Sequence, residues 1–113
     1  MKVLIAGSGG FLGRHFVSYL HEKNIKPYCL VRNKSVLPDF AEAIELDLLD
    51  RDKVKRLIHQ IRPDYVINLA ADLSEREHTG LLSSELSKTY FMGINLVDAL
   101  CVFPPSECFI SIG

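Results

Sequence analysis

The sequence predicts an α/β domain built on a doubly wound parallel sheet of about five strands. Short apolar runs alternate along the chain with segments whose apolar residues recur at helical spacing. The first run, residues 3–6, is apolar without alternation, as expected for a parallel strand that is covered on both faces. Glycines and then an amphipathic segment follow it directly. A chain of 113 residues is long enough for one such domain with a single core.

Composition and charge indicate a soluble globular protein. Hydrophobic residues make up 48% of the chain and charged residues 24%, and the formal net charge is −1. Because both signs of charge are interspersed, nothing suggests nucleic acid or an anionic membrane as a partner. The apolar run after Lys2 is too short for a secretory signal or a membrane span. We therefore expect a cytoplasmic protein.

The cysteines and histidines give no indication of a metal site. The three cysteines lack C-x-x-C spacing, and free cysteine tends to be buried, so we expect buried free thiols at Cys29, Cys101 and Cys108. The four histidines are scattered without metal-ligand spacing. We predict that no metal is bound.

The stretch 2–16, KVLIAGSGGFLGRHF, is expected to form a strand, a tight turn and the start of a helix. Gly7 lets the chain turn off the strand, Gly10 lets backbone approach a ligand, and Gly13 lets helix and sheet pack closely. The free amides of the helix and the positive end of its dipole point into the turn. A phosphate group is the ligand that this arrangement favours. An ordinary glycine-rich turn is the alternative interpretation.

Two elements are expected after the turn. In the first helix, Leu12, Phe16, Tyr19 and Leu20 recur at spacings of three and four and are expected to form its buried face. The second strand covers 27–31, with Pro27 at its beginning, where a missing amide does least harm.

The end of the second strand bears on the choice of cofactor. A dinucleotide fold that selects NAD places a carboxylate there for the ribose 2′-hydroxyl, whereas NADP needs a cation for the 2′-phosphate. Val31 occupies the acidic position and Arg32 follows it. A charge-assisted hydrogen bond is worth about 1.5–3 kcal/mol, so one arginine could favour NADP by roughly tenfold to a hundredfold. The sequence predicts NADP in preference to NAD; the alternative is that Arg32 is a solvated surface charge.

A weak third strand at 43–46 leads into a helix with the clearest periodicity in the chain. Asp50 is expected to cap this helix. Val54, Leu57, Ile58 and Ile61 lie at i, i+3, i+4 and i+7 and form its core stripe. Pro63 ends it by disfavouring helical geometry at the preceding residue.

The rest of the chain supplies two more strands and a long helix. The fourth strand, 64–71, ends in small residues, which leave room for a cofactor across the strand ends. A polar loop, 72–80, contains Ser74, Glu75, Arg76 and His78, which we interpret as a solvated loop at the glycine end of the sheet. The helix 81–100 is expected to carry Leu82, Leu86, Tyr90, Gly93, Val97 and Leu100 along one face. A fifth strand covers 108–112.

Three motifs together resemble the extended branch of the short-chain dehydrogenase/reductase superfamily, the NAD-dependent epimerase/dehydratase family. They are AGSGGFLGRH at 6–15, RPDYVINLAA at 62–71, and the residues Asn95, Leu96, Val97 and Ala99 of the long helix. The resemblance covers nearly the whole chain but only the cofactor-binding half of the family's fold. The fold predicted for it is a Rossmann sheet with strand order 3-2-1-4-5 and the ligand beside the first strand.

The resemblance also implies contacts with the cofactor. Asp47 would accept from the adenine amino group, and Leu48 would pack on the adenine ring. Leu69, Ala70 and Ala71 would contact the cofactor between its adenine half and the nicotinamide. The predicted cofactor-binding residues are Gly7, Gly10, Phe11, Leu12, Gly13, Arg32, Asp47, Leu48, Leu69, Ala70 and Ala71.

The long helix departs from the family pattern N-x-x-G-T-x-N-L-L-x-A. Thr89 stands where the pattern has its first Asn, which puts in doubt any water-holding or proton-relay role there. Met92 and Gly93 replace its Gly-Thr pair. Asn95 is retained from the pattern, but a structural role as a half-buried polar residue on the helix explains its presence equally well.

No catalytic residue can be named in this chain. The resembling family uses a Ser or Thr just past the fifth strand and a later Tyr-x-x-x-Lys, whose lysine lowers the pKa of the tyrosine. Ser111 comes too early, and Tyr19 with Lys23 has the spacing but is expected in the core. The chain is thus expected to be an N-terminal fragment, inactive alone, that lacks the catalytic and substrate-binding part. Phe109 and Ile110 would otherwise lie on a poorly covered edge strand.

Two functions remain open on the sequence. The first is the cofactor domain of an oxidoreductase or a sugar-nucleotide epimerase, dehydratase or reductase, with a nucleotide-sugar substrate in the full-length protein. The second is a non-catalytic dinucleotide-binding module or NADP sensor. A flavodoxin-like or receiver-type domain has the same alternation of strands and helices but does not explain glycines at three-residue spacing. The oligomeric state is left open.

Overall fold

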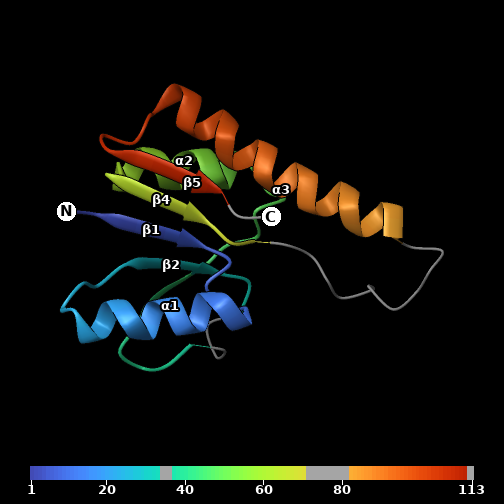
Figure 1. The fold of residues 1–113 in the computed structure, drawn as a ribbon. Coiled ribbons are helices and arrows are strands. Elements are labelled where there is room, and N and C mark those ends of the chain that lie inside the picture. Colours follow the sequence, from blue (N-terminus) through green and yellow to red (C-terminus); the bar gives the residue numbers. More distant parts are fainter. Residues whose placement is uncertain (34–36, 71–81, 112–113) are drawn as a thin grey trace.

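A five-stranded parallel sheet with strand order β3-β2-β1-β4-β5 forms the middle layer of the computed structural model, as predicted (Figure 1). The model describes residues 1–33, 37–70 and 82–111, and the side chains of 82–90 are not included. The strands are β1 Val3–Ala6, β2 Tyr28–Val31, β3 Glu42–Glu45, β4 Tyr65–Asn68 and β5 Cys108–Ser111. The helices are α1 Phe11–Glu22, α2 Arg51–Ile61 and α3 Leu82–Val102.

Both faces of the sheet are covered, and β1 takes part in both cores because its successive side chains point to opposite faces. Leu4 and Ala6 join one core with residues of α2 and α3, whereas Val3 and Ile5 join a second core with residues of α1. Figure 1 shows α1 on one side of the sheet and α2 and α3 on the other. The continuous apolar run at 3–6 therefore reflects a strand buried on both faces.

The fourth strand is shorter than the predicted 64–71. The Leu69 amide still donates to the Ala6 carbonyl at 2.8 Å, but the next amide, of Ala70, donates at 3.1 Å to the side chain of Asn68. A side-chain acceptor thus replaces the neighbouring strand and ends the ladder. The third strand begins and ends one residue earlier than predicted.

The predicted features of α2 are present. Asp50 caps it, with a carboxylate oxygen that accepts from the Lys53 amide at 3.2 Å. Val54, Ile58 and Ile61 are buried, and Leu57 packs against the same core. Arg62, immediately before Pro63, takes a left-handed conformation with φ 50°, which ends the helix.

The predicted buried face of α1 is wrong in two positions. Tyr19 is 54% exposed and Leu12 is also exposed, whereas the buried positions are Gly13, Val17 and Leu20. Gly13 packs against the backbone of the glycine turn, and this contact determines which side of the helix faces the sheet. Tyr19 is consequently not a core residue. It is also absent from the lining of the cleft described below, so its exposure does not make it a residue of that site.

The apolar face of α3 that the spacing predicts is only partly buried in the described part of the helix. Val97 is 44% exposed, and the buried residues of the described part of the helix are Met92, Leu96, Ala99 and Leu100. The reason is that apolar side chains lie on both sides of α3, since Phe91 and Ile94 are exposed as well. Periodicity alone therefore does not distinguish the core side from the solvent side.

Cys29 is a buried free thiol as expected, and burial raises its pKa. Cys101 and Cys108 are free but exposed, which corrects the expectation for them. Cys108 begins β5, the edge strand of the sheet that the described residues form, and Cys101 lies on the outward side of α3. None of the helices in the described part of the chain has the length and hydropathy required to cross a membrane.

Candidate functional site: a cleft at the carboxyl ends of the strands

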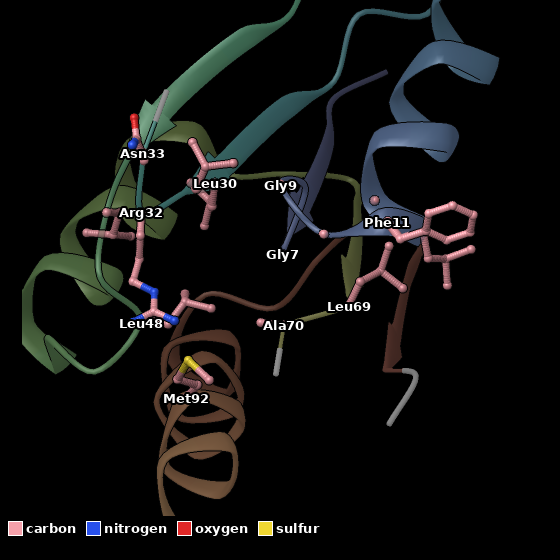
Figure 2. Close-up of a pocket in the computed structure, with 15 residues that line it drawn as sticks. Gly7, Gly9, Phe11, Leu30, Arg32, Asn33, Leu48, Leu69, Ala70 and Met92 are labelled. Carbon is pink, nitrogen blue, oxygen red and sulfur yellow. The ribbon is translucent and has the colours of Figure 1, made fainter. Parts of the chain in front are cut away.

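A cleft of about 580 Å³ opens where β1, β2 and β4 end, at the point where the strand order reverses. It lies between the start of α1 and the described part of α3 (Figure 2). Its lining residues are Gly7, Gly9, Gly10, Phe11, Leu12, Gly13, Leu30, Val31, Arg32, Asn33, Leu46, Leu48, Leu69, Ala70 and Met92.

Backbone packing requires two of the three predicted glycines. Gly7 has φ 81°, and a Cβ placed on it would lie 2.5 Å from the Ala70 nitrogen. A Cβ on Gly13 would overlap the backbone of Gly7 and Ser8. These glycines thus hold the end of β1, the start of α1 and the end of β4 in close contact.

Gly10 differs from the other two because none of the described residues fills the space beside it. A Cβ there would have Gly7 O, at 3.7 Å, as its nearest neighbour, which is ordinary contact. Gly10 is also the N-cap of α1 and brings no capping side chain. The first-turn amides of α1, with the positive end of the helix dipole, therefore face the cleft without a side-chain cap, an arrangement suited to an anion.

The end of β2 contributes the positive charge of the cleft. Arg32 lines both the cleft and an adjoining side pocket of about 290 Å³. In Figure 2 its side chain extends along the side of the cleft where Leu48 lies. The side pocket is mixed in charge and is lined by Arg32, Glu45, Leu46, Asp47, Asp50 and Lys53.

The side of the cleft opposite the glycine turn is apolar. Leu48, in the turn after β3, and Met92, on α3, are each 6% exposed and belong to the same core. The turn is held from within, because the Asp47 carboxylate accepts from the Leu49 amide at 2.9 Å and the Asp50 amide donates to the Asp47 carbonyl at 2.9 Å. It is held from outside by Asn95, whose Nδ2 donates to the Leu48 carbonyl at 2.8 Å.

The end of β4 forms the third side. Leu69 and Ala70 line the cleft there, and the small Ala70 leaves it open. Asn68 is buried behind them, where it accepts from the Ala70 amide and donates to the Ser111 hydroxyl at 3.2 Å. This asparagine joins the ends of β4 and β5 beside the cleft.

The structure brings together most of the predicted cofactor-binding residues. Asp47 does not line the cleft but opens onto the side pocket, and Ala71 lies outside the described residues, as do Ser74, Glu75, Arg76 and His78. The predicted residues that line the cleft are Gly7, Gly10, Phe11, Leu12, Gly13, Arg32, Leu48, Leu69 and Ala70.

Sequence reasoning missed several lining residues. Gly9, Leu30, Val31, Asn33 and Leu46 lie next to predicted positions, so strand-end placement could have indicated them. Met92 comes from a helix distant in the sequence. The one feature of the sequence that could have indicated it is that Met92 stands where the family pattern has a glycine.

The chemistry of the described cleft is that of binding. Arg32 is the one charged side chain among the residues that line it, beside backbone amides and apolar groups. The described residues also contain no group of three His, Cys, Asp or Glu side chains that could hold a metal ion. The described lining therefore suits an anionic ligand that also carries a flat ring.

Comparison with known proteins gives a family and a set of structures with the same fold. A model of the NAD dependent epimerase/dehydratase family matches residues 3–111. A 3-diazoavenalumate denitrifying reductase from a Streptomyces species is 32% identical over 68 residues, which are 60% of this chain and 22% of that protein.

Among solved structures, the UDP-glucose 4-epimerase of Thermotoga maritima with UDP-glucose superposes with a TM-score of 0.83 at 24% identity, over 98% of this chain and 37% of that one. The UDP-glucose 4-epimerase of Thermus thermophilus in complex with NAD gives 0.74 at 25% identity, over 91% of this chain and 34% of that one. The chain thus spans about a third of the length of these structures and less of the reductase.

Proposed function

Because the chain belongs to the NAD-dependent epimerase/dehydratase family, we propose that its cleft binds a nicotinamide dinucleotide for oxidoreductase or epimerase-like chemistry. The observation that carries the proposal is Gly10. It is the uncapped start of α1, it lines the cleft, and the part of the chain that the structure describes leaves open the space beside it. A residue with no packing reason to be glycine at a helix N-terminus is well explained by a phosphate group that approaches the backbone.

The lining residues suit the parts of such a cofactor. The first-turn amides of α1 would hold the pyrophosphate, and the apolar wall of Leu48 and Met92 would contact the adenine. Asp47, from the side pocket, remains the proposed acceptor for the adenine amino group. Leu69, Ala70 and Ala71 would lie along the path toward the nicotinamide. When bound, the nicotinamide supplies a hydride acceptor or donor.

We further propose that NADP is preferred over NAD. Arg32 is the charged residue of the cleft lining and follows β2 directly, where Val31 leaves no carboxylate for a ribose hydroxyl. Lys53 adds a second cation to the side pocket, although three carboxylates share that pocket. The Thermus thermophilus epimerase was solved with NAD, so the preference rests on this chain's own arginine.

In the whole protein, we propose that the cofactor serves a substrate bound by parts beyond this chain. A nucleotide sugar is the substrate class suggested by the UDP-glucose 4-epimerases that share the fold. The second candidate is a non-catalytic dinucleotide-binding module. It is favoured by the composition of the described cleft lining, in which Arg32 is the one charged side chain.

Isothermal titration of the chain with NADP⁺ and NAD⁺ tests the proposal, with Gly10→Val as the matched variant. The N-cap has φ −75° and ψ 174°, an extended conformation that valine adopts, so the variant should fold. We expect binding to the native chain and its loss in Gly10→Val. Failure of the folded native chain to bind either dinucleotide would overturn the proposed function.

A further inference from the structure

Asn95 connects two elements that form one side of the cleft. It lies on α3, three residues after Met92, and its side-chain amide donates to the backbone carbonyl of Leu48 at 2.8 Å. Both Met92 and Leu48 line the cleft. One side chain therefore joins the helix that carries Met92 to the turn that carries Leu48.

The chemistry of this contact explains why a polar residue lies on the inner side of α3. The Leu48 carbonyl is in a partly buried region, where an acceptor without a partner is costly. Within the turn, the Asp47 carboxylate and carbonyl hold the amides of Leu49 and Asp50. Neither of these bonds reaches the Leu48 carbonyl, so the bond from Asn95 fixes the part of the turn nearest the cleft.

A second contact joins α3 to the start of α2, just after this turn, but lies on the surface. Arg51 Nε and Asp98 Oδ2 are 3.0 Å apart, and both side chains are more than a third exposed. Exposed ion pairs of this kind generally contribute little. This pair holds the start of α2 against α3 and does not touch the lining of the cleft, so it provides an internal control.

We propose that Asn95 is a positioning residue that sets the distance between Leu48 and Met92 and so determines how tightly the cleft holds an adenine ring. The inference rests on the proposed dinucleotide function. A planar base packs well only against a wall whose parts keep a fixed spacing, because a side chain that shifts loses its contacts with the ring. Asn95 keeps Leu48 and Met92 in place in this wall without contacting the ligand.

The test compares binding of adenosine 2′,5′-bisphosphate, the adenine half of NADP, by the native chain and four variants. Asn95→Ala removes the bond, and Asn95→Asp keeps the shape but replaces the donor with an acceptor. Asp98→Ala removes the surface pair. Ile58→Val trims a buried core residue outside the cleft lining, at a cost in stability similar to that of a lost hydrogen bond.

We expect both Asn95 variants to weaken binding by about three- to tenfold, the usual effect of one neutral hydrogen bond, with Asp at the larger end. Asp98→Ala and Ile58→Val should bind within about twofold of the native chain at a temperature where all are folded. If the Asn95 variants also bind within about twofold, or if Ile58→Val weakens binding equally, Asn95 is only a structural residue. If the native chain itself fails to bind, the proposed function fails instead.

Discussion

The backbone of Gly7 lies directly against that of Ala70, so that the end of β1 and the segment after β4 touch beside the cleft. A Cβ on Gly7 would be 2.5 Å from the Ala70 nitrogen, and Gly7 has φ 81°. Both conditions exclude a side chain. The contact places the glycine turn at a fixed distance from the strand end that forms the third side of the cleft.

Gly7→Ala is expected to destabilise the fold by more than about 2 kcal/mol. It adds the cost of a left-handed conformation, roughly 1–2 kcal/mol, to an overlap with backbone that cannot move aside. Gly93→Ala is the matched control, because a Cβ on Gly93 would have no neighbour within 4 Å among the described residues, and Gly93 is inside a helix. It should stabilise by about 0.5–1 kcal/mol. Urea unfolding measures both, and equal effects would show that the close approach is unimportant.

Arg32→Ala is expected to weaken NADP⁺ binding by roughly tenfold to a hundredfold and NAD⁺ binding much less. The reason is that the variant removes the guanidinium and with it the proposed charge-assisted hydrogen bond to the 2′-phosphate. NAD⁺ has no 2′-phosphate and so does not make this bond. Titration with both dinucleotides measures the ratio. Lys53→Ala tests whether the second cation of the side pocket contributes. Equal weakening of NADP⁺ and NAD⁺ by Arg32→Ala would remove the basis for the NADP preference.

Met92→Ala is expected to weaken adenine-nucleotide binding, because the side chain that it shortens forms part of the apolar wall. The variant should also be less stable by about 2–5 kcal/mol at most, since Met92 is nearly buried. Phe91→Ala is a control on the same helix, with an exposed side chain outside the cleft lining. Competition between adenosine 2′,5′-bisphosphate and NADP⁺ reports the change, and unaltered binding in Met92→Ala would place the adenine elsewhere.

Asp64, which lies just before β4 at the end of the sheet away from the cleft, is expected to make the free energy of unfolding depend on pH. Its carboxylate accepts from the Ser106 hydroxyl and, at 2.8 Å, from the Lys2 amide, and these bonds hold its pKa below the ordinary value of 3.8. A lowered folded-state pKa contributes stability that is present above the unfolded-state value and is lost as pH falls through the folded-state value.

Asp64→Asn should therefore be less stable than the native chain near neutral pH, and the difference should shrink below pH 3.8. Ser106→Ala, which removes the donor with the largest effect on the pKa, should do the same to a smaller extent. Thermal unfolding from about pH 7 to about pH 3 provides the measurement. A difference that stays constant over this range would mean that the bonds do not favour the ionised form.

Much of the fold is encoded in local features of the sequence. The apolar run at 3–6, the glycines after it and the stripe of α2 depend on neighbouring residues alone, and each was predicted with the correct element type. The same holds for the Asp50 cap and for the end of α2 before Pro63. These features follow from backbone conformation and short-range periodicity, which a sequence displays directly.

The orientation of helices around the sheet was decided only by tertiary packing. The contact of Gly13 with the glycine turn rotates α1 so that Tyr19 faces outward, although spacing placed it with the core residues. On α3, apolar residues lie on several sides, and contact with α2 and the sheet selects Met92 and Leu96 for burial. A helical pattern specifies which residues share a face, but the face that is buried depends on its neighbours.

The residues of the cleft likewise fall into two groups, those predicted from the sequence and those that only tertiary packing places there. Its glycines, Arg32 and the end of β4 were predicted from the sequence, since they follow strands whose ends meet at one edge of a parallel sheet. Met92 and the bond from Asn95 to the Leu48 carbonyl were not predicted, because they join positions 44 and 47 residues apart in the chain. The sequence by itself determined the elements and the glycine turn, whereas the apolar wall exists only where packing brings α3 against the turn after β3.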